Sequence, residues 1–439
     1  MMQYQGTLAG SAPTSATEAI MRCIPPEGGL YVPARAPLIP RAFFNNLADM
    51  SLRDVAFVIT DAFLGGEFDS AELKKAVDES FNFNAPLVKL DKNLYAFELF
   101  HGPTLTFKDY GARMMARITS LIDRRSKRHN SRLILVATTG NSGAATANGF
   151  AGIDNAEVIV LFPRGTLTRM QTAQLTESGP NIRALEVSGT IENCKQMVSA
   201  ALEDPALAHL SPTGGNSINI VRMIPQTALA VYAYSRLMAQ EVKHADKAVY
   251  SIPSGNLGNY VAAMTAHLTG MPVGKLIAAV NANDPVRRKR AGLPADSIIK
   301  TIAPTMDVTE PSGYPRLQYM ADKYAGLLEN VLDFAEPVDD ATIAATILDA
   351  RKRYGYTPDP HSAVALAALS KYSRDVPRVF YATAHPARNL DIMTRVTGAA
   401  IELPVQLLRY MTVRRRAQSI APTYPALKKY ILTNIQPHT

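Results

Sequence analysis

The stretch "RLILVATTGNSGAATANGFAG", residues 132–152, contains in order a strand, a glycine-containing loop and a helix. After Arg132 its first part is a short run of leucine, isoleucine, valine and alanine, without the polar alternation of a half-exposed strand. The loop at 138–143 then supplies threonine, glycine, asparagine and serine side chains. The stretch therefore predicts a strand buried on both faces and followed by a helix, as in a parallel sheet.

The same order of strand, loop and helix recurs along the chain after about residue 130. Further buried strands are expected within 156–163, 182–190, 248–259, 274–284 and 377–386. Because these strands alternate with helices, we predict an α/β fold with parallel-rich sheets. Ligands bind at the carboxyl ends of such strands, so four loops are candidate binding segments: 138–143, 254–259, 281–284 and 383–388.

The two ends of the chain show other patterns. The segments "DVAFVITDAFLGG" (54–66) and "SAELKKAVDESF" (70–81) predict helices. We therefore expect residues 1–95 to form a mainly helical N-terminal region with some strand. The tail after residue 400 is predicted to form helices that pack back on the body.

The charge of the chain is positive but not concentrated. The net charge of the 439 residues is +8 and the pI is about 9.3. The dense basic runs, Arg124–Arg128 and Arg414–Arg416, have no interleaved aromatic residues. We interpret both runs as solvated helix ends and predict no nucleic-acid binding.

The cysteine count and the hydropathy of the chain indicate the cellular compartment to expect. Two cysteines, Cys23 and Cys194, are too few for a disulfide framework, and no cysteine–histidine spacing is typical of a metal site. No basic segment with an apolar core opens the chain, and no apolar run approaches the about 18 residues of a membrane span. We therefore expect a reduced cytoplasmic protein without a signal peptide, a membrane span or a metal.

One lysine, Lys108, lies in "FHGPTLTFKDYG" (100–111), between a run that looks buried and a predicted helix start. Asp109 fits the first turn of that helix. Burial and the positive end of the helix dipole both lower the pKa of an amine, as a Schiff-base lysine requires. Taken alone, a surface lysine at a helix start is the more common case.

Two glycine-containing loops favour the Schiff-base interpretation of Lys108 over the surface-lysine interpretation. "TTGNSGAA" (138–145) and "PSGNLGN" (253–259) each follow a strand and open a helix, where backbone N–H groups can bind an anion. Gly255 and Gly258 allow the backbone to close around an oxyanion. Together with Lys108 they indicate an anionic cofactor and an anionic substrate. The nucleotide-binding G-x-G-x-x-G and Walker patterns are missing from the sequence.

At this point the chain resembles the threonine synthase family of pyridoxal-phosphate (PLP) enzymes of fold type II. The matching stretches include "PEGGLYVP", "ELFHGPTLTFKDYGARMMA", "LVATTGNSGAATANGF", "GGNSINIVRMIPQ", "IPSGNLGNYVAA", "NANDPV", "DPHSAVALAAL" and "ATAHPA". The resemblance implies two α/β domains with parallel-rich sheets around a central cofactor cleft, plus the N-terminal helical region. The domains expected from it are residues 1–95, 96–235 and 236–439.

The resemblance also implies a role for each matched residue. Lys108 corresponds to the lysine that binds PLP covalently and moves protons. The residues matched to the cofactor site are Lys108, Asn141, Gly255, Asn256, Leu257, Gly258, Asn259 and Thr383. Among them Thr383 would meet the pyridine nitrogen, Asn141 the phenolic oxygen or the substrate carboxylate, and the glycine loop the phosphate. The residues matched to the substrate site are Thr139, Gly140, Asn216, Ser217 and Arg222, with Ser142 as a further candidate.

A substrate with a second anion follows from the matched arginine, hydroxyl and amide donors, which suit a phosphate dianion. The resemblance implies O-phosphohomoserine as substrate, and threonine and phosphate as products. It implies a monomer or a homodimer. His101, His361 and His385 lie in or near matched stretches, where packing roles are as expected as chemistry.

Several positions depart from the commonest pattern of the longer family members. Asn141 and Asn259 stand where an aspartate is usual, Ser142 replaces a threonine, and Arg388–Asn389 replaces a lysine and a phenylalanine. Three alternatives therefore stay open: a paralogue that releases a 2-oxo acid, an enzyme that replaces the γ-phosphate by another nucleophile, and a binding protein without catalysis. Intact Lys108 and both glycine loops argue against the last.

Overall fold

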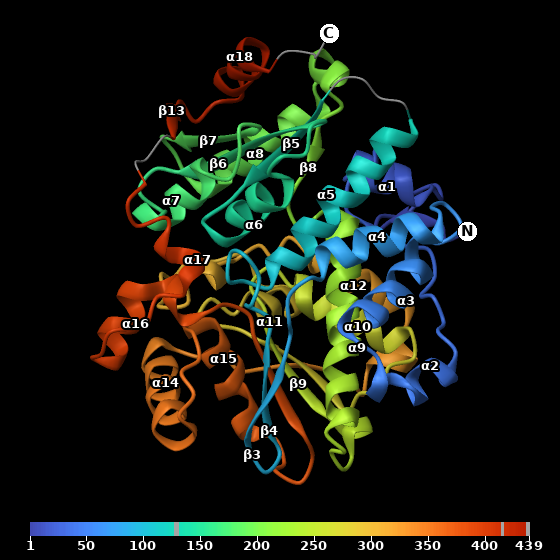
Figure 1. Cartoon of the computed structure of the whole chain (residues 1–439), viewed down its shortest axis with the longest axis vertical. Coiled ribbons are helices and arrows are strands. Elements are labelled where there is room, and N and C mark those ends of the chain that lie inside the picture. The colour runs from blue at the N-terminus through green and yellow to red at the C-terminus, as the bar shows by residue number, and fades with distance from the viewer. Residues whose placement is uncertain (127–130, 414–416, 436–439) are drawn as a thin grey trace.

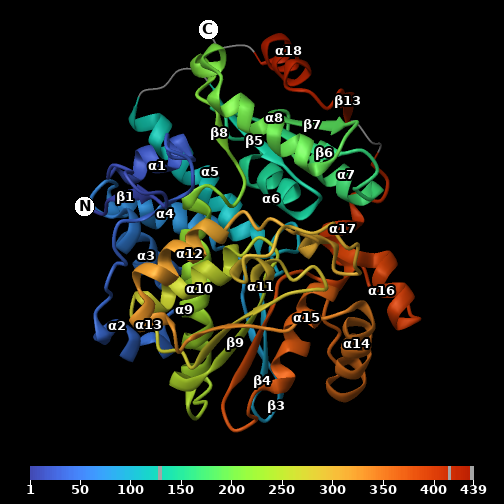
Figure 2. The same ribbon diagram turned by 180° about the vertical axis from the view of Figure 1, so that it is seen from behind.

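The computed structural model describes residues 1–126, 131–413 and 417–435 (Figure 1). Two sheets form separate lobes, and a helical N-terminal region lies along one side of both (Figures 1 and 2). Of the predicted basic runs, Arg124 and Arg125 end a helix as expected, whereas Lys127, Arg128 and Arg414–Arg416 lie outside the described residues. None of the described helices is long and apolar enough to cross a membrane.

The smaller lobe is built on a five-stranded sheet in which all strand pairs are parallel. Its order is β13-β7-β6-β5-β8. The strands predicted at 132–137, 156–163 and 182–190 are confirmed as β5, β6 and β7. The bounds are β5 Arg132–Ala137, β6 Ala156–Pro163, β7 Ile182–Val187, β8 Thr213–Gly214 and β13 Gln418–Ile420.

Both faces of this sheet are covered, as the unbroken apolar runs predict. Alternate residues such as Ile134 and Val136 enter one core cluster, and Leu133 and Leu135 enter another. The second cluster contains residues of α8 and of α18, the tail helix. The helices of this lobe are α5 Lys108–Arg125, α6 Asn141–Phe150, α7 Arg169–Thr176, α8 Ile191–Glu203 and α18 Tyr424–Asn434, while Leu407 of the short helix α17 Val405–Leu408 packs with Leu105 and Ala387.

The larger lobe is built on a six-stranded sheet with the order β11-β10-β9-β12-β4-β3. All pairs are parallel except the β3–β4 hairpin. One face packs on α9 and α10, and the other packs on α14 and α15. The bounds are β3 Leu87–Asp91, β4 Leu94–Glu98, β9 Val249–Pro253, β10 Lys275–Ala279, β11 Leu332–Phe334 and β12 Arg378–Ala382. The helices are α9 Met223–Ala239, α10 Gly258–Leu268, α11 Pro285–Arg290, α12 Tyr314–Lys323, α13 Ala325–Leu328, α14 Asp340–Tyr354, α15 Pro360–Ala368 and α16 Leu390–Thr397.

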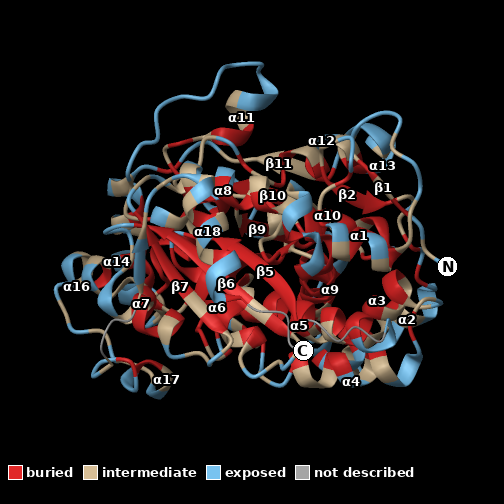
Figure 3. Cartoon of the chain, turned by 90° about the horizontal axis from the view of Figure 1, so that it is seen from above, coloured by how far each residue is buried: buried red, intermediate tan, exposed pale blue. Residues whose placement is uncertain are grey.

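The N-terminal region is mainly helical, as predicted. Ser51 begins α3 with a capping box to Asp54, and Asp69 caps α4 by accepting from Ala71 and Glu72. The two helices pack against α9 and α5 respectively, so this region extends the central core (Figure 3). The elements are β1 Tyr4–Gly6, α1 Ala16–Arg22, β2 Tyr31–Pro33, α2 Arg41–Asn45, α3 Leu52–Leu64 and α4 Ser70–Ser80.

Two short segments behave differently from the sequence-based expectation. The tail after residue 400 contains the strand β13 as well as helices, because residues 418–420 pair with β7 at the edge of the smaller sheet. The hairpin 87–98 joins the larger sheet. The three residues of β13 are partly exposed and too few to show a periodic pattern, so they form a strand only because β7 offers a partner. The predicted division of the chain into domains at residues 95 and 235 stays a prediction. Strands that precede and follow residue 235, β4 and β9, belong to the same sheet.

Candidate active site

Lys108 is the first residue of α5, which confirms the predicted helix start. The segment before it is held to the loop after β12: the Phe107 N–H donates to the Thr383 carbonyl at 3.0 Å, and the His385 N–H donates to the Leu105 carbonyl at 3.0 Å. Leu105 has a φ of 58°. These backbone contacts bring Lys108 and Thr383, which are 275 positions apart in the chain, to one edge of the larger sheet.

Asp109 closes the turn that precedes the helix. Its carboxylate accepts from the Thr104 N–H at 2.8 Å and from the Thr104 hydroxyl at 2.6 Å. The side chain is fully buried, and burial raises the pKa of this carboxyl to about 6, although the hydrogen bonds from Thr104 act in the opposite direction. Asp109 lies in the first turn of α5, as predicted, but its carboxylate binds Thr104 before the helix and caps none of the helix's own N–H groups, so the predicted cap role is wrong.

The Lys108 amine lies inside the molecule and contacts the smaller lobe. Its Nζ donates to the Ser142 hydroxyl at 2.9 Å. Burial lowers the pKa of the Lys108 amine to about 8, and the charge of Arg222 acts in the same direction. A lysine with this pKa is partly neutral near pH 7, which is the state required of a nucleophile or a base.

The first glycine loop forms a tight turn into α6. Gly140 has a φ of 145°, a conformation that L side chains rarely adopt. The Thr138 hydroxyl accepts from the N–H groups of Gly140 and Gly143, each at 3.0 Å. Thr138 was not among the predicted site residues, although its hydroxyl shapes the loop. Thr139 is exposed at the turn, and Ser142 is half-buried.

Asn141 is held by an arginine from the other lobe. Nε and Nη2 of Arg388 donate to Asn141 Oδ1 at 3.2 and 2.7 Å. Nη1 of Arg388 donates to Gln174 Oε1 on α7. All three side chains are buried. The sequence marked Arg388 as a departure from the family pattern, but neither this contact nor Gln174 was predicted.

The second glycine loop leads into α10. Leu257 precedes the helix with a φ of 65°, and its side chain makes no capping hydrogen bond. Asn256 Oδ1 accepts from the N–H and the hydroxyl of Ser312, both at 3.1 Å, which fixes the loop. Gly313 is required beside it, because an added Cβ would lie 2.5 Å from the Asn256 carbonyl oxygen.

The space in front of α10 suits a phosphate group. The first N–H groups of a helix have no intrahelical partner, and no side chain of Leu257 occupies them. An added Cβ on Gly258 would point toward this space, 3.4 Å from Gln226 Oε1 and 3.8 Å from Ser217 Cβ. Asn259 Nδ2 and Gln226 Oε1 are buried without a hydrogen-bond partner among the described residues. Gln226 was not predicted from the sequence.

Arg222 is buried at the start of α9, next to α5. Nη1 donates to the Thr146 hydroxyl at 2.9 Å and to the Gly215 carbonyl at 2.6 Å. Its Nε has no partner among the described residues, and burial lowers the pKa of this guanidinium to about 10. An added Cβ on Gly111 would come within 3.2 Å of that Nε. Part of the guanidinium therefore braces the protein, while Nε is buried against α5 without a hydrogen-bond partner among the described residues.

The predicted pair Asn216 and Ser217 lies between these loops. Asn216 Oδ1 accepts from the Ala137 N–H at 3.1 Å, and its Nδ2 donates to the Ala137 carbonyl at 2.9 Å. Most of the amide is thus used to hold the end of β5. The Ser217 carbonyl accepts from Nη1 of buried Arg316 at 2.9 Å, while Ser217 itself lines a small pocket with Asn256 and Gly258.

A buried carboxylate, Asp359, supports Thr383 from behind. Asp359 caps α15 and accepts from the N–H groups of His361 and Ser362, from His361 Nδ1 at 2.5 Å and from the Ser362 hydroxyl. The Thr383 N–H in turn donates to the Ser362 hydroxyl at 3.2 Å. Asn389, whose identity the sequence left unexplained, donates to Asp359 Oδ2 at 3.5 Å.

The three histidines have structural partners. His361 Nε2 accepts from the Thr305 N–H at 3.2 Å, in addition to its bond to Asp359. His385 caps the turn at Ala387, and half-exposed His101 pairs with Glu98 at 2.7 Å. These contacts favour the packing interpretation for all three.

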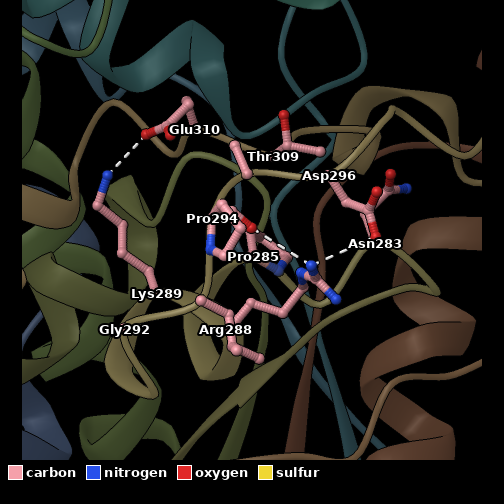
Figure 4. Close-up of a pocket in the computed structure, with 11 residues that line it drawn as sticks. Asn283, Pro285, Arg288, Lys289, Gly292, Pro294, Asp296, Thr309 and Glu310 are labelled. Atoms are coloured by element: carbon pink, nitrogen blue, oxygen red, sulfur yellow. Dashed lines mark hydrogen bonds and ion pairs between the residues drawn. The ribbon is translucent and has the colours of Figure 1, made fainter.

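A pocket of about 270 Å³ lies elsewhere, along α11 and the segment that follows it (Figure 4). Its cations are paired: Lys289 contacts Glu310 at 2.6 Å and Arg288 contacts Asp296 at 3.3 Å. None of the predicted site residues lines it. Only Asn283 connects it with the carboxyl end of β10, so we do not take this larger pocket as the active site.

Two buried arginines and half-buried Lys108 therefore lie near one buried acid. Lys108 comes from α5, Arg222 from the turn just before α9, and Arg388 from the turn after β12; Asp109 is the acidic group that influences both arginines. Burial lowers the pKa of Arg388 to about 10. An excess of buried positive charge is costly unless anions accompany it, so this group of residues is suited to a ligand set with several negative charges.

Comparisons with known proteins agree with this geometry. The model of the family described as "Pyridoxal-phosphate dependent enzyme" matches residues 80–378, and that of "Threonine synthase N terminus" matches residues 3–81. Threonine synthases of Buchnera aphidicola and Escherichia coli are 32% and 31% identical to this chain, over 92% and 96% of it and over 93% and 97% of the relatives.

Solved structures show the same relationship. The threonine synthase of Escherichia coli superposes with a TM-score of 0.91 at 30% identity and covers 98% of this chain and 100% of its own. The PLP-bound threonine synthase of Brucella melitensis has a TM-score of 0.90 at 28% identity, over 99% of this chain and 100% of its own.

Proposed function

Because this chain belongs to the threonine synthase family of PLP-dependent enzymes, we propose that it converts O-phospho-L-homoserine and water to L-threonine and phosphate. The observation that carries the proposal is the meeting of Lys108, at the start of α5, with Ser142 at the start of α6. This contact places a partly neutral amine beside the first of two anion-binding loops. A cytosolic location and a monomeric or homodimeric state remain predictions.

The residues present fit PLP. The Lys108 amine would bind the cofactor's aldehyde carbon, and the N–H groups of Gly258 and Asn259 would hold its phosphate. Gly255, Asn256 and Leu257 shape that loop. Thr383, held by Ser362, would offer its hydroxyl to the ring nitrogen, and Asn141 would meet the phenolic oxygen or the substrate carboxylate. Bound PLP supplies an electron sink for negative charge that develops on the substrate carbons.

Lys108 is the residue to which we assign proton transfer. Released from the cofactor, its amine can accept the substrate's α-proton, because a pKa of about 8 leaves part of it unprotonated near neutrality. The Ser142 hydroxyl, 2.9 Å from Nζ, holds the amine toward the smaller lobe. The protonated amine can then return a proton to a neighbouring carbon.

The substrate's two anionic groups would bind on opposite sides of Lys108. Arg222 would offer its buried positive charge to the phosphate, with Ser217 and the remaining N–H of Asn216 beside it. Thr139 and Gly140, at the start of α6, would hold the carboxylate, and Ser142 is a further candidate for the phosphate. A substrate without a phosphate would leave the Arg222 charge unneutralised.

The decisive experiment measures both products at once. Purified protein is incubated with PLP and O-phosphohomoserine, and phosphate and the organic product are quantified together. Equal amounts of phosphate and threonine support the proposal. Phosphate with 2-oxobutyrate would instead favour a phospho-lyase, and an added thiol or amine that appears in the product would favour γ-replacement. No turnover with bound PLP would contradict all three reactions.

A further inference from the structure

Arg388 and Asn141 form a contact between the two lobes, next to the contact of Ser142 with Lys108. Arg388 follows β12 of the larger lobe, and Asn141 opens α6 of the smaller lobe. The exposed fractions of the two side chains are only 5% and 7%. Two N–H groups of the guanidinium donate to the single oxygen Asn141 Oδ1, at 3.2 and 2.7 Å.

This contact determines the orientation of the amide. A guanidinium has five N–H donors and no acceptor, so only the oxygen of an asparagine can face it. Gln174 fixes the guanidinium from the other side, because its Oε1 accepts from Arg388 Nη1. Asn141 Nδ2 must then point away from Arg388, and that nitrogen is not among the buried polar atoms left without a partner.

We propose that Arg388 is a positioning residue that locks the Asn141 amide with its NH₂ group toward the cleft. Position 141 then acts only as a hydrogen-bond donor to an anionic oxygen. The inference rests on the proposed function for the identity of that oxygen, which is either the cofactor's phenolic oxygen or the substrate's carboxylate. Both are anionic oxygens, which accept hydrogen bonds from an NH₂ group.

The charge of Arg388 strengthens this role. Among the described residues no ion pair joins it to a carboxylate, and its direct partners are two neutral amides. The charged or titratable groups that influence it are Asp109 from α5 and Tyr410 from the segment after α17. The guanidinium therefore polarises the Asn141 amide, which makes its N–H groups better donors to an anion.

An aspartate at position 141 would change the chemistry. Its second oxygen would face the cleft as an acceptor, and the carboxylate would neutralise Arg388. The pair observed here thus gives this position a donor where the commoner family pattern has an acidic residue. This accounts for the joint presence of Asn141 and Arg388.

A double-mutant cycle tests the proposal. Arg388→Met and Asn141→Ala are compared singly and together for the PLP dissociation constant, the visible absorbance of the bound cofactor across pH, and the KM for O-phosphohomoserine. We expect Arg388→Met alone to weaken one of these constants by about 10- to 100-fold, the effect of losing a hydrogen bond to a charged group. In the Asn141→Ala background, Arg388→Met should weaken the same constant by less than about 3-fold.

The pattern of effects identifies the oxygen. If Arg388→Met changes the PLP affinity or the absorbance titration without substrate, the partner of Asn141 is the cofactor's phenolic oxygen. If it raises the KM and leaves the cofactor properties unchanged, the partner is the substrate's carboxylate. Arg388→Lys keeps a charged donor and should recover part of the loss. Equal effects of Arg388→Met in both backgrounds, or no effect in either, would overturn the proposal.

Controls separate this role from mere support of the fold. Arg132 is also a buried arginine, paired with Asp123 at 2.5 Å on the far end of β5, and Arg132→Met should lower thermal stability without altering any of the three cofactor and substrate readouts. If Arg388→Met does not fold, Arg388→Lys with and without Asn141→Ala completes the cycle. Failure of the proposed function would appear differently, as a wild-type protein without a cofactor absorbance or product.

Discussion

Replacing Lys108 by methionine should stabilise the protein without cofactor, because the wild-type buries an amine that water solvates better. Burial lowers its pKa from the ordinary 10.5 to about 8. At about 1.4 kcal/mol per pH unit, this fall corresponds to about 3 kcal/mol of folding free energy spent on the charged amine. The hydrogen bond to Ser142 returns about 1 kcal/mol, so Lys108→Met should gain about 2 kcal/mol at pH 7.

The sign of the pH dependence follows from the two protonation midpoints. The unfolded chain binds the lysine proton below about pH 10.5 and the folded chain binds it only below about pH 8. Between these values the unfolded state holds more protons, so the stability of the wild-type rises with pH. The advantage of Lys108→Met is therefore complete below pH 8 and disappears as pH approaches 10.5.

The assay is urea unfolding of both proteins without PLP, followed by circular dichroism at pH 7, 8, 9 and 10. Lys74→Met is the control, because Lys74 is a surface residue in an exposed pair with Asp78 on α4. Its stability difference from the wild-type should change little over this range. A Lys108→Met difference that is the same at pH 7 and pH 10 would refute the argument that the amine is desolvated.

Three further outcomes are expected. Arg222→Ala should raise the KM for O-phosphohomoserine by about 100-fold, since a buried charge-assisted contact to the phosphate is lost. The PLP dissociation constant should change by less than about 3-fold. An equal loss of substrate and cofactor affinity would place Arg222 at the cofactor. Gly258→Ala should weaken PLP binding by more than about 10-fold in absorbance titrations, because its Cβ enters the space in front of α10, while thermal unfolding without PLP stays unchanged. Asp359→Ala should lower the free energy of unfolding by about 3 kcal/mol in urea, because His361 and Ser362 lose a shared buried acceptor; a loss under about 1 kcal/mol would contradict that role.

Local patterns of the sequence were sufficient for much of the fold. The apolar runs at 132–137 and 156–163 became neighbouring parallel strands, since a strand buried on both faces needs apolar residues at successive positions. The start of α5 at Lys108 was also predicted, because Asp109 is a local helix signal. The strand at 418–420 was not predicted, because its pairing with β7 supplies the order that its own residues lack.

The candidate site divides in the same way. Glycine loops after strands and a lysine at a helix start are signals within a few residues, so the sequence alone predicted the two candidate anion-binding loops and the candidate reactive amine. Gln174, Gln226 and Asp359 were missed because buried amides and carboxylates have no sequence pattern of their own. Their roles appear only in the partners that they contact or lack.

What the sequence by itself determined was which chemical groups stand at the ends of strands and the starts of helices. Only the tertiary structure decided which of these groups meet: Lys108 with Ser142, and Arg388 with an asparagine 247 positions away. It also decided their protonation, since the low pKa of Lys108 comes from burial between two lobes. Hydrogen bonds and desolvation depend on distance in space, which the order of residues along the chain does not contain.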